Sequence, residues 1–173
     1  MKIERRILPT SLLAVVAATL LLAACTASAP PPEPSADPLV AWNERVLAMA
    51  EEEDGFLTLK GLRTAAMMHV AVHDALNAVD RRYAPYAYDG EAPEADPQAA
   101  AAEAAYGVVV SQFPDHEPAL AAARDEWLAA VDDGEAKSAG RAVGRAAAEA
   151  ILAERDADRW DGEAAYEWHP MGP

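Results

Sequence analysis

The sequence predicts an all-α protein, a bundle of about five helices. Hydrophobic residues make up 52% of the 173 residues but aromatic residues only 6%, and much of the apolar content is alanine, which has the highest helix propensity. No stretch alternates between apolar and polar residues for long, as a half-buried strand would. A core of this composition is built from helices that approach closely, rather than from large side chains.

The first 24 residues are predicted to be a lipoprotein signal peptide. Lys2, Arg5 and Arg6 form a positive start, and an apolar run follows. Leu22-Ala23-Ala24-Cys25 then fits a bacterial lipobox, in which the cysteine is lipidated and becomes the new N-terminus. An ordinary secretory signal and an uncleaved membrane anchor are the alternatives. We therefore expect an exported protein, held at a bacterial membrane of the cell envelope through lipid on Cys25.

Residues 25–36 are rich in proline, serine and alanine, which predicts a semi-extended tether. The helical domain is expected over residues 37–158. Its first helix begins near Pro38, with Asp37 as the N-cap. Four consecutive acidic residues and Gly55 end that helix. Cys25 is the only cysteine, so the mature domain is expected to lack an intramolecular disulfide.

The second helix, within residues 57–88, organises the rest of the chain. Its apolar residues recur near helical spacing and predict a buried stripe. A neighbouring strip is polar. We expect the helix to continue into the Asp80-Arg81-Arg82-Tyr83 segment, until Pro85 stops it. The predicted stripe comprises Leu59, Leu62, Ala66, Val70, Ala71 and Leu76, and the polar strip comprises His69, His73, Asn77 and Asp80.

Three further helices are predicted from capping and breaking signals. Asp96 and Pro97 open the third helix, which runs to Phe113. Pro114 breaks it, and Asp115 is expected to cap the fourth. The fifth helix spans about residues 135–157. Its Gly140 and Gly144 are one turn apart and predict close packing against the second or third helix. Residues 159–173 are expected to be an irregular tail.

The formal net charge of −15 argues against nucleic-acid binding, which requires a basic face. No nucleic-acid partner is therefore expected.

Several segments together resemble a known family. His69-Val70-Ala71-Val72-His73-Asp74-Ala75-Leu76-Asn77-Ala78, followed by Arg82-Tyr83 and Pro85-Tyr86, resembles the N-terminal helical region of bacterial vanadium-dependent haloperoxidases. That family belongs to the type 2 phosphatidic acid phosphatase superfamily. Val40-Ala41-Trp42-Asn43 and Phe113-Pro114-Asp115 are similar to flanking segments. The resemblance implies an incomplete version of the haloperoxidase helical fold.

The catalytic segments of that family are missing from this sequence. The family binds vanadate or phosphate through a lysine with a nearby arginine-proline pair, a serine-glycine-histidine segment, and a later arginine followed by a histidine. Lys60 and Lys137 lack the downstream arginine-proline pair, and no histidine follows a serine-glycine pair. We assign no catalytic or cofactor-binding residue here, and expect vanadate or phosphate only if a catalytic half is supplied.

His69 and His73 are the weak candidates for a metal site. Residues at positions i and i+4 share one helix face and can share a metal, but a site needs further ligands. Asp74 and Asp80 are the only close ones. Histidines that fill polar gaps or contact a separate catalytic half are the simpler interpretation, so no metal is assigned. For Asp74, a structural ion pair or hydrogen bond is the simpler interpretation.

The sequence therefore predicts a non-catalytic helical portion of a haloperoxidase- or acid-phosphatase-like exported lipoprotein, inactive alone and truncated or split from its catalytic half. The expected partners are the membrane and either a separate catalytic half or a second copy of the chain. The alternative is a stand-alone, membrane-tethered helical lipoprotein with a binding or structural role.

Overall fold

The computed structural model describes residues 37–55 and 58–162, and this part of the chain is all-helical. It contains α2 (Asp37–Asp54), α3 (Leu59–Val79), α4 (Pro97–Gln112), the short 3₁₀ helix η1 (Pro114–His116), α5 (Glu117–Leu128) and α6 (Glu135–Glu154). The prediction of an all-α bundle is confirmed. The predicted signal peptide, Cys25 and the tether lie outside the described residues, as does the tail from residue 163.

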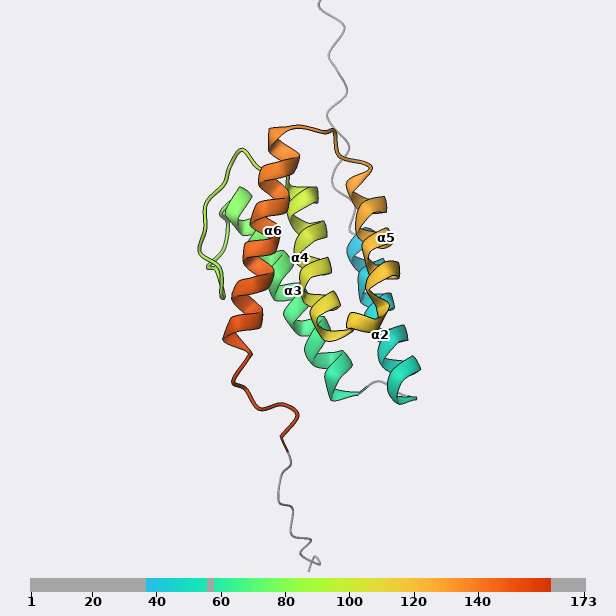
Figure 1. The fold of residues 1–173 in the computed structure, drawn as a ribbon. Coiled ribbons are helices and arrows are strands. Elements are labelled where there is room, and N and C mark those ends of the chain that lie inside the picture. Colours follow the sequence, from blue (N-terminus) through green and yellow to red (C-terminus); the bar gives the residue numbers. More distant parts are fainter. Residues whose placement is uncertain (1–36, 56–57, 163–173) are drawn as a thin grey trace, which may run out of the picture. The chain divides into compact units, whose positions relative to one another are not determined.

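Helix α4 is central to the bundle, because it contacts α2, α3, α5 and α6 (Figure 1). Alanines fill most of its buried positions, so neighbouring helices approach its backbone closely. Larger buried side chains close the core, among them Phe113, Met68, Leu120 and Ile151. No helix in the described residues is both long enough and apolar enough to cross a membrane.

The capping signals around α4 act as predicted, but the one proposed for α5 does not. Asp96 caps α4 by accepting a hydrogen bond from the Ala99 backbone N–H at 2.8 Å. Helix α4 ends one residue before Phe113. The predicted cap at Asp115 is wrong: Asp115 lies inside η1, and α5 begins at Glu117 without a side-chain cap. Pro114 therefore starts a turn of 3₁₀ helix rather than a direct break between two α-helices.

The two glycines of α6 lie against α4, as their spacing predicted. A Cβ atom added at Gly140 would lie 2.9 Å from the Ala99 Cβ. A Cβ atom added at Gly144 would lie 2.7 Å from the Glu103 Cβ. Both distances are shorter than real Cβ contacts, so only glycine allows these helices to approach so closely. Helix α6 ends at Glu154, three residues earlier than expected.

The predicted buried stripe of α3 is wrong. Leu59 is 67% exposed, Leu62 is 52% exposed and Leu76 is 40% exposed, and of the six predicted residues only Ala71 is fully buried. The face that packs into the bundle instead carries small, polar and sulfur-containing residues. These are Gly61, Thr64, Met67, Met68, Ala71, Val72, Asp74, Ala75, Asn77 and Ala78.

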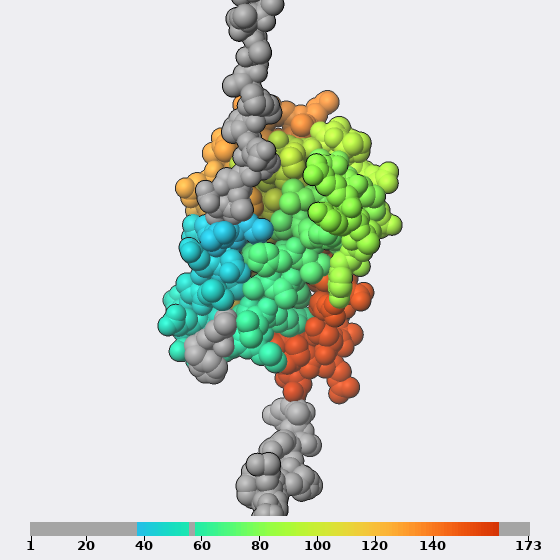
Figure 2. Space-filling model, turned by 180° about the vertical axis from the view of Figure 1, so that it is seen from behind, coloured from blue at the N-terminus to red at the C-terminus, as the bar shows by residue number. Residues whose placement is uncertain are grey.

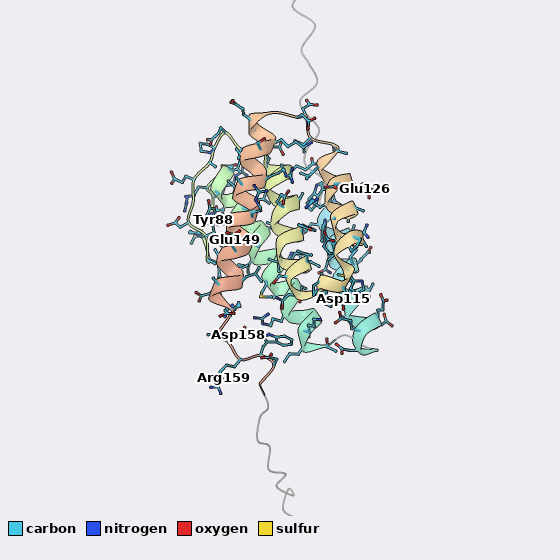
Figure 3. All side chains as sticks on the ribbon, in the orientation of Figure 1. Tyr88, Asp115, Glu126, Glu149, Asp158 and Arg159 are labelled. Atoms are coloured by element: carbon cyan, nitrogen blue, oxygen red, sulfur yellow. The ribbon has the colours of Figure 1, made fainter. Side chains whose placement is uncertain are left out.

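Arg63 joins α3 to the end of α6. Its guanidinium donates hydrogen bonds to the Arg155 backbone carbonyl at 2.8 Å, to the Gln112 side chain at 3.0 Å and to Asp158 at 3.0 Å. The first of these satisfies a carbonyl at the C-terminal end of α6, where a positive charge also complements the helix dipole. Asp158 is labelled beside this junction in Figure 3.

This junction predicts a pH-dependent contribution to stability. The hydrogen bond from Arg63 holds the pKa of Asp158 below its usual value of 3.8. A lowered carboxyl pKa stabilises the fold at pH values above the ordinary pKa, and the effect is lost as pH falls through the lowered pKa. We therefore expect Asp158→Asn to lower the melting temperature slightly at pH 7. The two melting curves should converge near pH 2, and a difference that persists there would contradict this origin.

Candidate functional site

Asp74 anchors the loop that follows α3. Its carboxylate is almost completely buried and accepts three backbone hydrogen bonds, from Tyr86 at 2.8 Å, Ala87 at 2.7 Å and Tyr88 at 2.9 Å. The prediction that Asp74 has a structural hydrogen-bonding role is confirmed. The nearby cations have other partners, because Lys60 pairs with Glu53 and Arg81 pairs with Asp89.

Asn77 explains why α3 ends earlier than predicted. Its side-chain oxygen accepts hydrogen bonds from the backbone N–H groups of Arg82 and Tyr83, both at 2.9 Å, and its amide nitrogen donates to the Tyr83 carbonyl at 2.8 Å. Short polar side chains that bond nearby backbone in this way compete with the helix. The helix therefore stops at Val79, well before Pro85.

The two histidines do not form a metal site with the acidic residues near them. His69 lies 3.4 Å from the Asn43 side-chain oxygen, and His73 lies 3.2 Å from the Ala84 carbonyl. The oxygens of Asp74 already accept backbone hydrogen bonds. Across residues 37–55 and 58–162, no group of three or more His, Cys, Asp or Glu side chains is placed to hold a metal ion.

The histidines instead belong to a surface made by α2 and α3, which lie side by side in Figure 2. Leu62, His69, His73 and Leu76 are spaced seven, four and three residues apart, so they share one face of α3. On α2, the exposed Val40 and Leu47 share a side with the exposed Glu44. Asn43 contacts His69. We call this surface the α2/α3 face. Its residues are Val40, Leu47, Leu59, Leu62, His69, His73 and Leu76.

Helix α3 contributes no charged side chain to this face. Its only charged residues are Lys60, Arg63 and Asp74. Lys60 pairs with Glu53, Arg63 with Asp158, and Asp74 is buried. An uncharged strip of leucines and histidines about five turns long is unusual on the surface of a chain with a net charge of −15. Exposed leucines gathered on one helix face are a candidate interaction site.

Sequence reasoning missed this face because it assigned the leucines of α3 to the core. The sequence of α3 nevertheless contained a signal for its orientation in the bundle. Polar Thr64, Asp74 and Asn77 lie on the opposite side, and each finds a hydrogen-bond partner there.

Comparisons with known proteins supply no relative. No family model matches the chain, and no curated protein or solved structure matches it significantly. The functional interpretation therefore depends on the sequence and on the geometry described above.

Proposed function

We propose that this chain is the non-catalytic helical portion of a haloperoxidase- or acid-phosphatase-like exported lipoprotein, and that it is inactive until a separate catalytic half packs against it. The α2/α3 face carries this proposal. It is the surface on which a helical partner would bury Leu62 and Leu76. The family assignment depends on the resemblance of residues 69–86 to the haloperoxidase N-terminal region, and the export and lipid anchor depend on the predicted lipobox at Cys25.

The geometry of α3 supports a helical partner in particular. The exposed residues at positions 62, 69, 73 and 76 follow helical spacing, which is the pattern that one helix presents to another. Burying exposed leucines contributes about 25 cal/mol per Å² of apolar area, which makes a docked partner favourable. The buried side of α3 is already occupied by the loop and the core, so a partner would reach only the α2/α3 face.

Sequencing the genomic DNA on the 3′ side of the codon for Pro173, in all three frames, tests the proposal directly. The expected result is a nearby frame that encodes a lysine, an arginine-proline pair and a serine-glycine-histidine segment. Co-expression of that product with this chain should then give a complex whose activity requires vanadate or phosphate. A sequence without those motifs would overturn the split-enzyme proposal and leave the alternative below.

The alternative is a stand-alone tethered binding or structural domain, and the completeness of the core favours it. Phe113, Met68 and Leu120 are fully buried or nearly so. Among the described residues, every buried side-chain nitrogen or oxygen has a hydrogen-bond partner. Such a core is expected to unfold in one cooperative transition without a partner. A partner would then be recruited by a domain that is already folded.

Substitutions on the α2/α3 face are expected to change binding without changing stability. Leu62→Glu combined with Leu76→Glu should reduce binding of a hydrophobic dye and abolish association with the catalytic half. The free energy of unfolding should change by less than about 1 kcal/mol, since both side chains are exposed. Ala122→Glu, at an exposed position of α5, is the matched control. Unchanged dye binding in the double variant would show that this face is not the apolar surface in solution.

Sedimentation analysis of the same variants distinguishes the two proposed kinds of partner. A second copy of this chain on the α2/α3 face would give a dimer that Leu62→Glu and Leu76→Glu convert to a monomer. If the wild-type chain is a monomer, the separate catalytic half remains the proposed partner.

A further inference from the structure

A groove of about 330 Å³ lies between α3 and the end of α6, which are side by side in Figure 2. Its floor is apolar, because Met67 from α3 and Ile151 from α6 line it and are almost completely buried. Ala66 and Val70 also line it, and Ala66 is exposed. The groove is therefore an apolar surface open to solvent, next to the α2/α3 face but sharing no residue with it.

Two arginines stand at the rim of the groove, and only one of them has a carboxylate partner. Arg63 pairs with Asp158, the one carboxylate among the described residues that line the groove. The Arg155 guanidinium instead lies 5.4 Å from the centroid of the Tyr86 ring and donates a hydrogen bond to the Tyr86 hydroxyl. The pKa of Asp158 is lowered mainly by the hydrogen bond from Arg63, and Arg155 contributes least. Arg155 therefore remains able to pair with a carboxylate that enters the groove.

The chain turns toward this groove after α6 ends. Arg159 has a φ of 56°, the only positive φ of a residue other than glycine in the described part of the chain. Such residues are uncommon and mark a constrained turn. The Gly162 backbone N–H donates to the Arg159 carbonyl at 3.0 Å, and the centroid of the Trp160 ring lies 5.2 Å from the Arg63 guanidinium. Figure 3 labels Asp158 and Arg159 at this turn. Because Arg63 lines the groove, the next residues begin beside its opening.

Those next residues, Glu163-Ala164-Ala165-Tyr166-Glu167-Trp168, have the chemistry that the groove would accept. The part of α3 that lines the groove spans seven residues, or about 10 Å at the helical rise. Six residues in extended form span about 20 Å, so Tyr166 can reach the far end. In an extended segment Tyr166 and Trp168 point to one side and Glu167 points to the other. Both rings can then face the apolar floor while Glu167 meets the rim.

We propose that residues 163–168 pack into the groove between α3 and α6 as a strap. The rings of Tyr166 and Trp168 cover the apolar floor, and Glu167 pairs with Arg155. Attachment at Gly162 makes this an intramolecular event with a high effective concentration, so weak contacts are enough to hold the strap. The strap does not depend on the proposed function, because it leaves the α2/α3 face uncovered.

Disulfide crosslinking of the full chain, with Cys25→Ser to remove the natural thiol, tests the strap. Ala66→Cys places a thiol in the groove, and Ala164→Cys places one on the same side of the segment as Tyr166. The control for Ala66→Cys is Ala153→Cys, at an exposed position of α6 that lies outside the groove and nearer to Gly162 in sequence. Mass spectrometry of a digest measures the linked fraction over time. The Ala66–Ala164 pair should link at least about tenfold faster than the Ala153–Ala164 pair.

Removing the two rings tests why the link forms. Tyr166→Ser combined with Trp168→Ser should slow the Ala66–Ala164 link to the rate of the control pair, because the rings supply the apolar contacts. Ala66 is exposed, so its replacement by cysteine should leave the fold unchanged. Three results would overturn the proposal: equal rates for the two pairs, an unchanged rate without the rings, or a link that joins two chains rather than one.

Discussion

Replacing Asp74 by alanine is expected to lower the free energy of unfolding by about 3–5 kcal/mol, which is the upper range for a single substitution. The carboxylate accepts three hydrogen bonds from consecutive backbone N–H groups, at residues 86–88. Without it, three donors near the core lose their acceptor together, and each unsatisfied buried donor costs about 1–3 kcal/mol. The loop can release part of this cost by detaching from α3, which would expose Ala87 and Tyr88.

Asp74→Asn removes the negative charge of this side chain but keeps its size, so it measures how much the charge contributes. The amide retains one acceptor oxygen but points an N–H group at backbone donors, so we expect a loss between those of wild type and Asp74→Ala. Urea denaturation monitored by circular dichroism measures both variants. Glu126→Ala, labelled on the exposed side of α5 in Figure 3, is the control and should change stability by less than about 0.5 kcal/mol. A loss of under about 1 kcal/mol in Asp74→Ala would show that the loop is not held by this carboxylate.

The sequence predicted the existence of the helices well, and it predicted the ends of α4 because those depend on local chemistry. Asp96 and Pro97 supply a cap and a preset backbone angle at the start of α4. Pro114 cannot continue the same helix. The close approach at Gly140 and Gly144 was also predictable, because a spacing of four residues places both on one face.

The orientation of α3 was not predictable in the same way. Hydrophobicity alone places Leu62 and Leu76 inside and Asp74 outside, and the structure reverses this. The reason is that the loop after α3 returns across the helix and brings backbone donors that need acceptors. A buried Asp74 and Asn77 satisfy those donors, and this requirement arises only from tertiary contacts.

The cluster of charged side chains between α4, α5 and α6 also depends on tertiary contacts. Glu103, Arg124 and Arg145 are far apart in the sequence, and each alone is typical of a solvated helix surface. They meet because α6 packs closely on α4 and α5 follows α4. The exposed Asp125 pairs with Arg124, whereas the buried Glu103 has no local signal that distinguishes it.

Replacing Gly144 by valine should destabilise the bundle by about 3 kcal/mol or more, through overpacking at the crossing of α6 and α4. A Cβ atom at this position would lie against the Ala100 carbonyl oxygen, 2.7 Å from the Glu103 Cβ and 2.8 Å from the Ala104 backbone nitrogen. Two of these three neighbours are backbone atoms of the central helix, so they cannot move aside as a flexible side chain can. Relief requires α6 to shift away from α4.

For Gly144→Ala, helix propensity and crowding predict opposite changes in the stability of the bundle. Helix propensity alone predicts that alanine stabilises α6 by about 1 kcal/mol relative to glycine. The crowding at Gly144 predicts a net loss instead, because the added Cβ atom meets backbone. Ala142→Gly, at an exposed position of α6, measures the propensity term in the same helix. A melting temperature for Gly144→Ala at or above that of wild type would show that α4 and α6 separate easily.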